Sequence, residues 1–234
     1  MSLKGYVRIN GREKNAIDTL QELDYIKTID NIMNWLAHIL LSEPNVENRL
    51  GNLLGDLVKG KDLDGLNSNL RRGVSRHYAI DKFTDSHPIV KISKKRIDKE
   101  YSKFAGILID VFYDHLLAKN WAIYSDTIFA DFTAEIYESF QKYSGEIPPS
   151  ARQIIEYMVD GDWLTSYQHL SGVKNTLDRI DYRIRARMGD RIKLVDAMPI
   201  LERESIDLEQ DFHSFFPELQ HHIKEWAISS FSSR

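Results

Sequence analysis

Apolar residues recur at helical spacing along most of the chain. Val46, Leu50 and Leu53, for example, fall on one face of a helix, and Gly60 follows as a stop signal. No segment alternates between apolar and polar residues in the way that a half-buried strand requires. The pattern therefore predicts an all-α fold, with helices that begin at Met33 and cover 46–58, 63–86, 104–124, 127–142, 172–188 and 194–226, and with one more helix opened by Pro148-Pro149-Ser150.

The same pattern indicates how the chain is divided. Residues 33–234 contain no linker rich in Pro, Ser or Gly, so we expect one compact multi-helix domain there. Residues 1–32 are polar and only weakly periodic, and we interpret them as an N-terminal extension. Its first residues, Met1-Ser2-Leu3, resemble the remnant of an expression vector.

Composition excludes several classes of protein. Of the 234 residues, 42% are hydrophobic and 28% are charged, which is typical of a globular protein and excludes a disordered one. The net charge of −4 argues against a globally basic nucleic-acid binder. The absence of cysteine excludes disulfides, thiolate ligands and cysteine nucleophiles. No apolar run approaches the ~20 residues of a membrane span and no signal peptide is visible, so we expect a soluble, cytoplasmic protein.

Polar residues inside apolar helical stripes are the candidates for chemistry, because their burial is costly unless they are paired or bind a metal. His38 lies among apolar neighbours in the segment MNWLAH, which also contains Asn34. Asp56 ends the segment GNLLGD, which contains Asn52 and two glycines that disfavour a helix. Such glycines are expected where another backbone or a ligand approaches closely. A core histidine and a tight helix crossing are the alternatives without chemistry.

A second candidate group lies in the helix predicted over 63–86. His77, Asp81 and Asp85 are four residues apart and therefore share one helix face. This is the geometry in which two side chains of one helix can bind one metal. A solvated charged face would produce the same spacing.

A third group interrupts the most apolar predicted helix. Asp110 and Asp114 share one face there, and His115 follows directly. Buried acids paired with arginine are the structural alternative. Imidazoles and carboxylates without thiolates suit Mn²⁺, Mg²⁺, Fe²⁺ or Zn²⁺. Helices that gather such ligands can activate water for attack on a phosphoryl group, so the pattern predicts a metal-dependent hydrolase.

Four segments resemble the acyl-carrier-protein phosphodiesterase family, also called holo-ACP hydrolase: MNWLAH (33–38), GNLLGDLVKG (51–60), RHYAIDKFTDSHP (76–88) and LIDVFYDHLLAKNW (108–121). The resemblance extends, more weakly, from Met33 to the end of the chain. It implies an all-α fold related to the HD phosphohydrolases. It also implies hydrolysis of the phosphodiester that joins 4′-phosphopantetheine to a serine of holo-acyl carrier protein. The cofactor implied is a divalent cation, with Mn²⁺ expected first and Mg²⁺ or Fe²⁺ as alternatives.

The resemblance also implies a ligand set. HD domains use a His, then an adjacent His-Asp pair, then a distant Asp. His38 and Asp56, with Asp110 or Asp114, follow that order and are the expected metal ligands. Gly55 stands where the pair would have its His, so the sequence departs from the pattern at this point.

The missing imidazole is expected to come from His77 or His115, either of which can serve as general acid toward the leaving serine oxygen. We expect Asp81 to act with them as a catalytic residue. Further side chains are expected to contact the phosphate or to orient the ligands: Asn34, Asn52 and Asp85.

A carrier-protein substrate requires a docking surface, and acyl carrier protein is acidic. Six basic and two acidic residues lie between 179 and 193, which reverses the sign of the overall charge. We therefore predict docking at Arg183 and Arg187, with Arg76 as a rival closer to the site in sequence. A solvated helix face is the alternative. The sequence gives no indication of the oligomeric state.

Three functions are consistent with these features. The main hypothesis is a metal-dependent phosphodiesterase that acts on holo-acyl carrier protein. The first alternative is the same site acting on a nucleotide or another small phosphoester, as in other HD hydrolases. The second is a non-catalytic helical binding module. Because an idle site has no reason to bury charges, the candidate His and Asp residues favour an enzyme.

Overall fold

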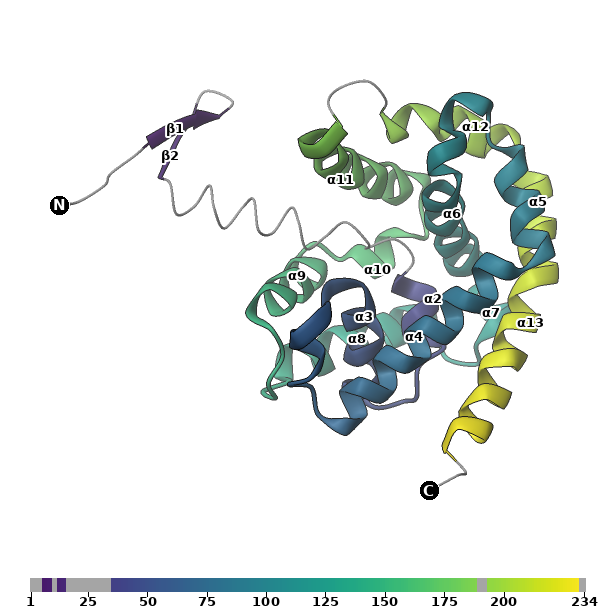
Figure 1. Ribbon diagram of the computed structural model, residues 1–234. Coiled ribbons are helices and arrows are strands. Elements are labelled where there is room, and N and C mark those ends of the chain that lie inside the picture. The colour runs from purple at the N-terminus through teal and green to yellow at the C-terminus, as the bar shows by residue number, and fades with distance from the viewer. Residues whose placement is uncertain (1–5, 10–11, 16–34, 189–192, 232–234) are drawn as a thin grey trace.

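The structure, a computed structural model, describes residues 6–9, 12–15, 35–188 and 193–231 (Figure 1). It confirms the predicted all-α domain. The α-helices are α2 (Trp35–Leu40), α3 (Val46–Leu57), α4 (Ser68–Ser86), α5 (Pro88–Arg96), α6 (Ala105–Lys119), α7 (Trp121–Tyr124), α8 (Phe129–Lys142), α9 (Pro149–Asp160), α10 (Trp163–Ser166), α11 (Leu170–Met188), α12 (Met198–Arg203) and α13 (Ser205–Phe231). Short 3₁₀-helices join some of them: η2 (Gly60–Leu63), η3 (Lys99–Phe104) and η4 (Leu194–Ala197).

Two short strands precede the helices, although the sequence predicts none. β1 (Tyr6–Ile9) pairs with β2 (Arg12–Asn15) as an antiparallel hairpin in which Tyr6 lies opposite Asn15. Each strand has only four residues, which is too short for apolar–polar alternation to be distinguished from chance.

Several helix boundaries differ from the prediction, and the region expected over 194–226 is divided into η4, α12 and α13. The helix expected over 63–86 begins only at Ser68, because the side chain of Asn67 caps it by accepting from the backbone N–H of Leu70 at 3.0 Å. Pro88 follows that helix and opens α5, which the sequence did not predict as a separate helix, since the first turn of a helix tolerates proline. The region expected over 104–124 is divided at Asn120 into α6 and α7.

Helix α6 is the centre of the domain. Eleven of its 15 residues are buried, and it packs against α2, α5, α11 and α13. A helix that is apolar on all sides is one that the fold surrounds. Aromatic rings of α13, such as Phe212 and Phe216, complete the core on one side. No helix in the described part of the chain is long and apolar enough to cross a bilayer.

Helices α3 and α4 lie in backbone contact, side by side in Figure 1. A methyl group on Gly51 would overlap the carbonyl oxygen of Leu70, and one on Gly73 would overlap that of Asn48. The helices can approach this closely only because neither glycine has a side chain. The glycines that disfavour a helix in the sequence are therefore explained by tight packing.

We predict that Gly73→Ala destabilises the protein by about 1–3 kcal/mol, since the obstacle is backbone that cannot move aside. Gly106→Ala is the control, because the methyl group would meet only the end of the flexible Lys94 side chain at 3.7 Å. That change should stabilise α6 by up to about 1 kcal/mol. Urea denaturation of both variants measures the difference. Equal stability of the two variants would contradict the close crossing.

Candidate functional site

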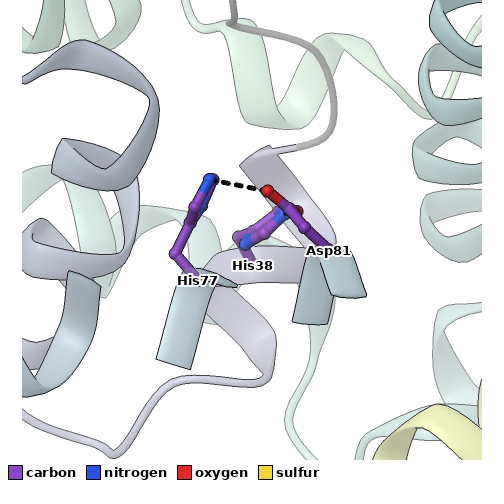
Figure 2. Close-up of side chains that lie close together, drawn as sticks. All are labelled: His38, His77 and Asp81. Carbon is purple, nitrogen blue, oxygen red and sulfur yellow. Dashed lines mark ion pairs between the residues drawn. The ribbon is translucent and has the colours of Figure 1, made fainter. Parts of the chain in front are cut away.

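Two histidines and two aspartates meet between α2, α3 and α4. Figure 2 shows His38 from α2 converging with His77 and Asp81 from α4, and one ligand atom of each lies within 4.8 Å of the others. His77 Nε2 lies 3.0 Å from Asp81 Oδ2 and 3.3 Å from Asp56 Oδ1 of α3. His38 Nε2 lies 3.3 Å from Asp81 Oδ1. The two imidazole rings stack with their centroids 4.4 Å apart.

The short helix α2 is held in place by Asp114 of α6. The two carboxylate oxygens accept the first-turn N–H groups of Leu36 and Ala37, each at 2.9 Å. Burial raises the pKa of Asp114 to about 8, although these two hydrogen bonds oppose the shift. Asp114 was expected as a metal ligand, but its oxygens serve the helix terminus. It positions His38 instead of joining the cluster.

Asn52 fixes the tautomer of His38. Its amide nitrogen faces the backbone carbonyl oxygen of His38 at 2.9 Å, which can only accept a hydrogen bond. The amide oxygen of Asn52 therefore faces His38 Nδ1, at 2.7 Å, and Nδ1 must carry the proton. In the neutral ring, the lone pair is then on Nε2, which points into the cluster.

His77 occupies the space left by Gly55. A methyl group at Gly55 would overlap the ring of His77. The imidazole of α4 therefore lies over α3 directly beside Asp56, where the sequence lacks the expected histidine. The other Asp56 oxygen accepts from Trp35 Nε1 at 3.1 Å, which orients the carboxylate. Between the two expected sources of the missing imidazole, the geometry favours His77 over His115.

The charges in the cluster depend on one another. Burial disfavours the charged form of His77, but the carboxylates of Asp56 and Asp81 outweigh it and raise the pKa of His77 to about 10. Burial likewise opposes ionisation of Asp81, but the neighbouring imidazoles of His38 and His77 outweigh burial and hold its pKa well below the usual range. Without a metal, the cluster is an ion-paired network of imidazole and carboxylate.

The residues of this cluster fit a divalent cation. His38 Nε2 is buried and has no hydrogen-bond partner, and its lone pair faces the oxygen of Asp81. Two electron-rich atoms facing each other need a proton or a cation between them. Imidazole nitrogens and carboxylate oxygens suit Mn²⁺, Mg²⁺ and Fe²⁺. The Asp81 side chain is 43% exposed while those of His38 and His77 are almost fully buried, so the cluster opens to solvent on the Asp81 side.

Asp110 and Asp85 lie beside the cluster. Asp110 is half-buried on α6, and burial together with the charges of Asp81, Asp85 and Asp56 raises its pKa to about 8, with Lys94 opposing. Asp110 therefore lies near the carboxylates of the cluster. Asp85 is exposed and pairs with Lys94 at 2.9 Å, so it lies at the rim. The roles expected of both residues remain predictions.

Two of the expected residues lie elsewhere. His115 Nδ1 donates to the carbonyl oxygen of Tyr167 at 2.7 Å, and no contact in the described chain joins it to the cluster. Arg76 is only 5% exposed, and its guanidinium donates to Leu41 and Glu43. Arg76 therefore anchors the segment after α2, and its expected role in docking is corrected for this reason. Further predicted residues fall outside the described residues or side chains: Asn34, Arg183 and Arg187.

Trp35 is not among the site residues predicted from the sequence, although its indole orients Asp56. The spacing of Trp35 and His38, three residues apart in one helix, places both on the same face. That spacing is the signal that would have linked Trp35 to the site.

The chain is similar to known proteins over most of its length. A family model described as acyl carrier protein phosphodiesterase matches residues 33–219. The chain belongs to the acyl carrier protein phosphodiesterase family. The acyl carrier protein phosphodiesterase of Serratia proteamaculans is 28% identical over 82% of this chain and 98% of its own length. The acyl carrier protein phosphodiesterase of Pectobacterium atrosepticum is 28% identical over 78% of this chain and 90% of its own length. That of Enterobacter sp. strain 638 is 29% identical over 80% of this chain and 95% of its own length.

The family is one of enzymes, and the match confirms the resemblance carried by the four sequence segments. No solved structure matches the chain significantly. The relation to the HD phosphohydrolases therefore stays a prediction.

We predict that His77 of metal-free protein keeps its proton at neutral pH. Its pKa, about 10 when folded, exceeds the unfolded value of about 6.5. The resulting stabilisation is fully present below pH ~6.5 and is lost as the pH rises through ~10. NMR titration of the ring after EDTA treatment measures the pKa, and Asp81→Asn should lower it toward the ordinary value. A wild-type pKa near 6.5 would exclude the pairing with Asp56 and Asp81.

Proposed function

We propose that this protein hydrolyses the phosphodiester that links 4′-phosphopantetheine to a serine of holo-acyl carrier protein. The observation that carries the proposal is the convergence of His38, His77 and Asp81 on one partly open point beside Asp56. The family supports a carrier-protein phosphodiesterase, and this donor set supports a divalent cation at the site, with Mn²⁺ expected first.

In the proposed reaction, a water oxygen bonds to phosphorus while the bond from phosphorus to the serine oxygen breaks. One proton of the water goes to the serine oxygen, so the products are apo-acyl carrier protein and 4′-phosphopantetheine. A divalent cation bound here would polarise a phosphoryl oxygen and lower the pKa of water.

The chain's own residues have distinct parts in this proposal. His38, His77 and Asp81 would hold the cation, and Asn52 would keep the lone pair of His38 directed at it. Asp56, oriented by the indole N–H of Trp35, places a second carboxylate beside His77. This set replaces the expected one of His38, Asp56 and Asp110 or Asp114.

The place of His77 also bears on the expected relation to HD domains. An imidazole from α4 lies in the space that a side chain at position 55 would fill. We infer that His77 substitutes in space for the histidine that the HD pattern places before Asp56. As a ligand, His77 would not also serve as the general acid expected of it.

We predict that incubation with holo-acyl carrier protein and Mn²⁺ removes the phosphopantetheine mass from the carrier, and that EDTA abolishes the reaction. Asp81→Asn should lower the rate by more than about 100-fold, which exceeds the loss of activity typical when a residue that only orients a metal ligand is changed. Asp207→Asn is the matched control, since this carboxylate is exposed on α13 and pairs with Arg96. Mass spectrometry of the carrier follows the reaction.

Three outcomes decide the proposal. A metal-dependent loss of mass that Asp81→Asn abolishes supports it. No loss of mass with Mn²⁺ bound would reject the carrier-protein substrate. Loss of mass that persists in EDTA would reject the cation.

A further inference from the structure

A lysine from α5 lies at the rim of the ligand cluster. Lys94 Nζ is 2.9 Å from Asp85 Oδ1, and Asp85 follows Asp81 by four residues on the same face of α4. The side chain of Asp85 is 74% exposed and that of Lys94 is 27% exposed. The ammonium group therefore lies about one helical turn from a carboxylate of the cluster, on the side where the cluster opens to solvent.

Helix α6 lies along the other side of this lysine. A methyl group on Gly106 would lie 3.7 Å from both Cε and Nζ of Lys94, so the end of the side chain runs over this glycine. Asp110 follows Gly106 by four residues, on the same face of α6. Burial raises the pKa of Asp110 to about 8, and the charge of Lys94 opposes that shift. Lys94 thus extends from α5 between α4 and α6, toward the carboxylates of the site.

The other basic residues of α5 are directed elsewhere. Arg96 pairs with carboxylates of α13, and Lys91 donates to a backbone carbonyl oxygen at the end of α4. Lys95 is exposed. Lys94 is therefore the cation that α5 directs at the site.

The ammonium group of Lys94 has donors to spare. One of its three N–H groups donates to Asp85, and within the described residues it makes no second hydrogen bond. The pair with Asp85 contributes little to the stability of the fold, because Asp85 is exposed and solvent screens the attraction. A partly exposed cation with two further N–H groups is suited to an anionic ligand.

We propose that Lys94 donates to a phosphoryl oxygen of the substrate and is a further catalytic residue. The inference rests on the proposed function, because it assumes that the phosphodiester lies at the cluster of His38, His77 and Asp81. A phosphodiester is an anion, and negative charge grows on its phosphoryl oxygens as water attacks. Carboxylates at the rim repel that charge, whereas an ammonium group already in place stabilises it. Lys94 keeps its protons throughout and contributes hydrogen bonds and charge.

The same geometry gives Asp85 a part in the proposal. An ionised carboxylate accepts hydrogen bonds and cannot donate them, so Asp85 cannot bind an anionic phosphoryl oxygen directly. Its Oδ1 instead accepts from Lys94 and fixes the direction of the ammonium group. Asp85 is then a positioning residue that acts through Lys94.

The test measures the Kd of inorganic phosphate for the Mn²⁺-loaded protein by calorimetry. Lys94→Met should raise this Kd about tenfold, the effect of losing one charge-assisted hydrogen bond. Lys94→Arg should recover most of the affinity, because it keeps the charge and the donors. Lys95→Met is the matched control, since it removes the same charge from the next, exposed residue of α5 and should leave the Kd as in wild type. The affinity for Mn²⁺ should be unchanged in all three variants.

The same proteins are also assayed for cleavage of holo-acyl carrier protein. Lys94→Met should lower kcat about 100-fold, the loss typical when one donor to the charge of a transition state is removed. Lys94→Arg should restore most of this rate.

The outcomes separate this inference from the proposed function. Equal weakening of phosphate by Lys94→Met and Lys95→Met would overturn the contact, because phosphate would then respond only to net charge. Weaker binding of Mn²⁺ in Lys94→Met would overturn it as well, because the lysine would then support the ligand cluster. Cleavage by wild type together with unchanged phosphate binding in Lys94→Met would reject the role of Lys94 alone. Phosphate binding that depends on Lys94 in a wild type that does not cleave holo-acyl carrier protein would support the contact and reject the proposed substrate.

Discussion

The backbone contact between α3 and α4 is the constraint on which the candidate site depends. Gly51 and Gly73 let the helices touch, and Gly55 leaves room for the His77 ring. If any of the three had a side chain, the helices would separate, and the carboxylate of Asp56 would move away from the imidazole of His77. The tight crossing is therefore what brings acids and imidazoles from separate helices within reach of one another. Glycines that are unfavourable for each helix alone are favourable for the pair.

A second constraint is the cost of burying ionisable groups. Hydrogen bonds from outside the cluster orient these groups. Asp114 accepts from the start of α2, Asn52 accepts from His38 Nδ1, and the indole N–H of Trp35 donates to Asp56. The cluster that results has a lone pair of His38 directed at a carboxylate oxygen of Asp81. A proton or a cation between these two atoms makes the arrangement favourable, and we propose a cation. The same supports would keep the ligand positions fixed during turnover.

The sequence predicted the helices and most of the cluster, because both follow from local spacing. His77 and Asp81 share a helix face whatever surrounds them. The sequence could not predict which side chains meet across the fold, because those contacts depend on how the helices pack. Asp110 and Asp114 also share a helix face, yet packing commits only Asp114 to the start of α2 and leaves Asp110 near the carboxylates of the cluster. Arg76 was expected at the surface but is buried, and it donates to the carbonyl oxygen of Leu41 after α2. The sequence could not predict this contact, because it depends on how α4 packs against that segment.

The central claim is that His38 and His77 hold one divalent cation. Pulsed electron paramagnetic resonance of bound Mn²⁺, with and without ¹⁵N-histidine labelling, tests it most directly, because it detects imidazole nitrogen bonded to the ion. The account predicts couplings from two imidazoles, one of which disappears in His38→Gln and the other in His77→Gln. His115→Gln should leave both couplings unchanged. A spectrum of bound Mn²⁺ without imidazole nitrogen, or one that loses a coupling only in His115→Gln, would contradict the account.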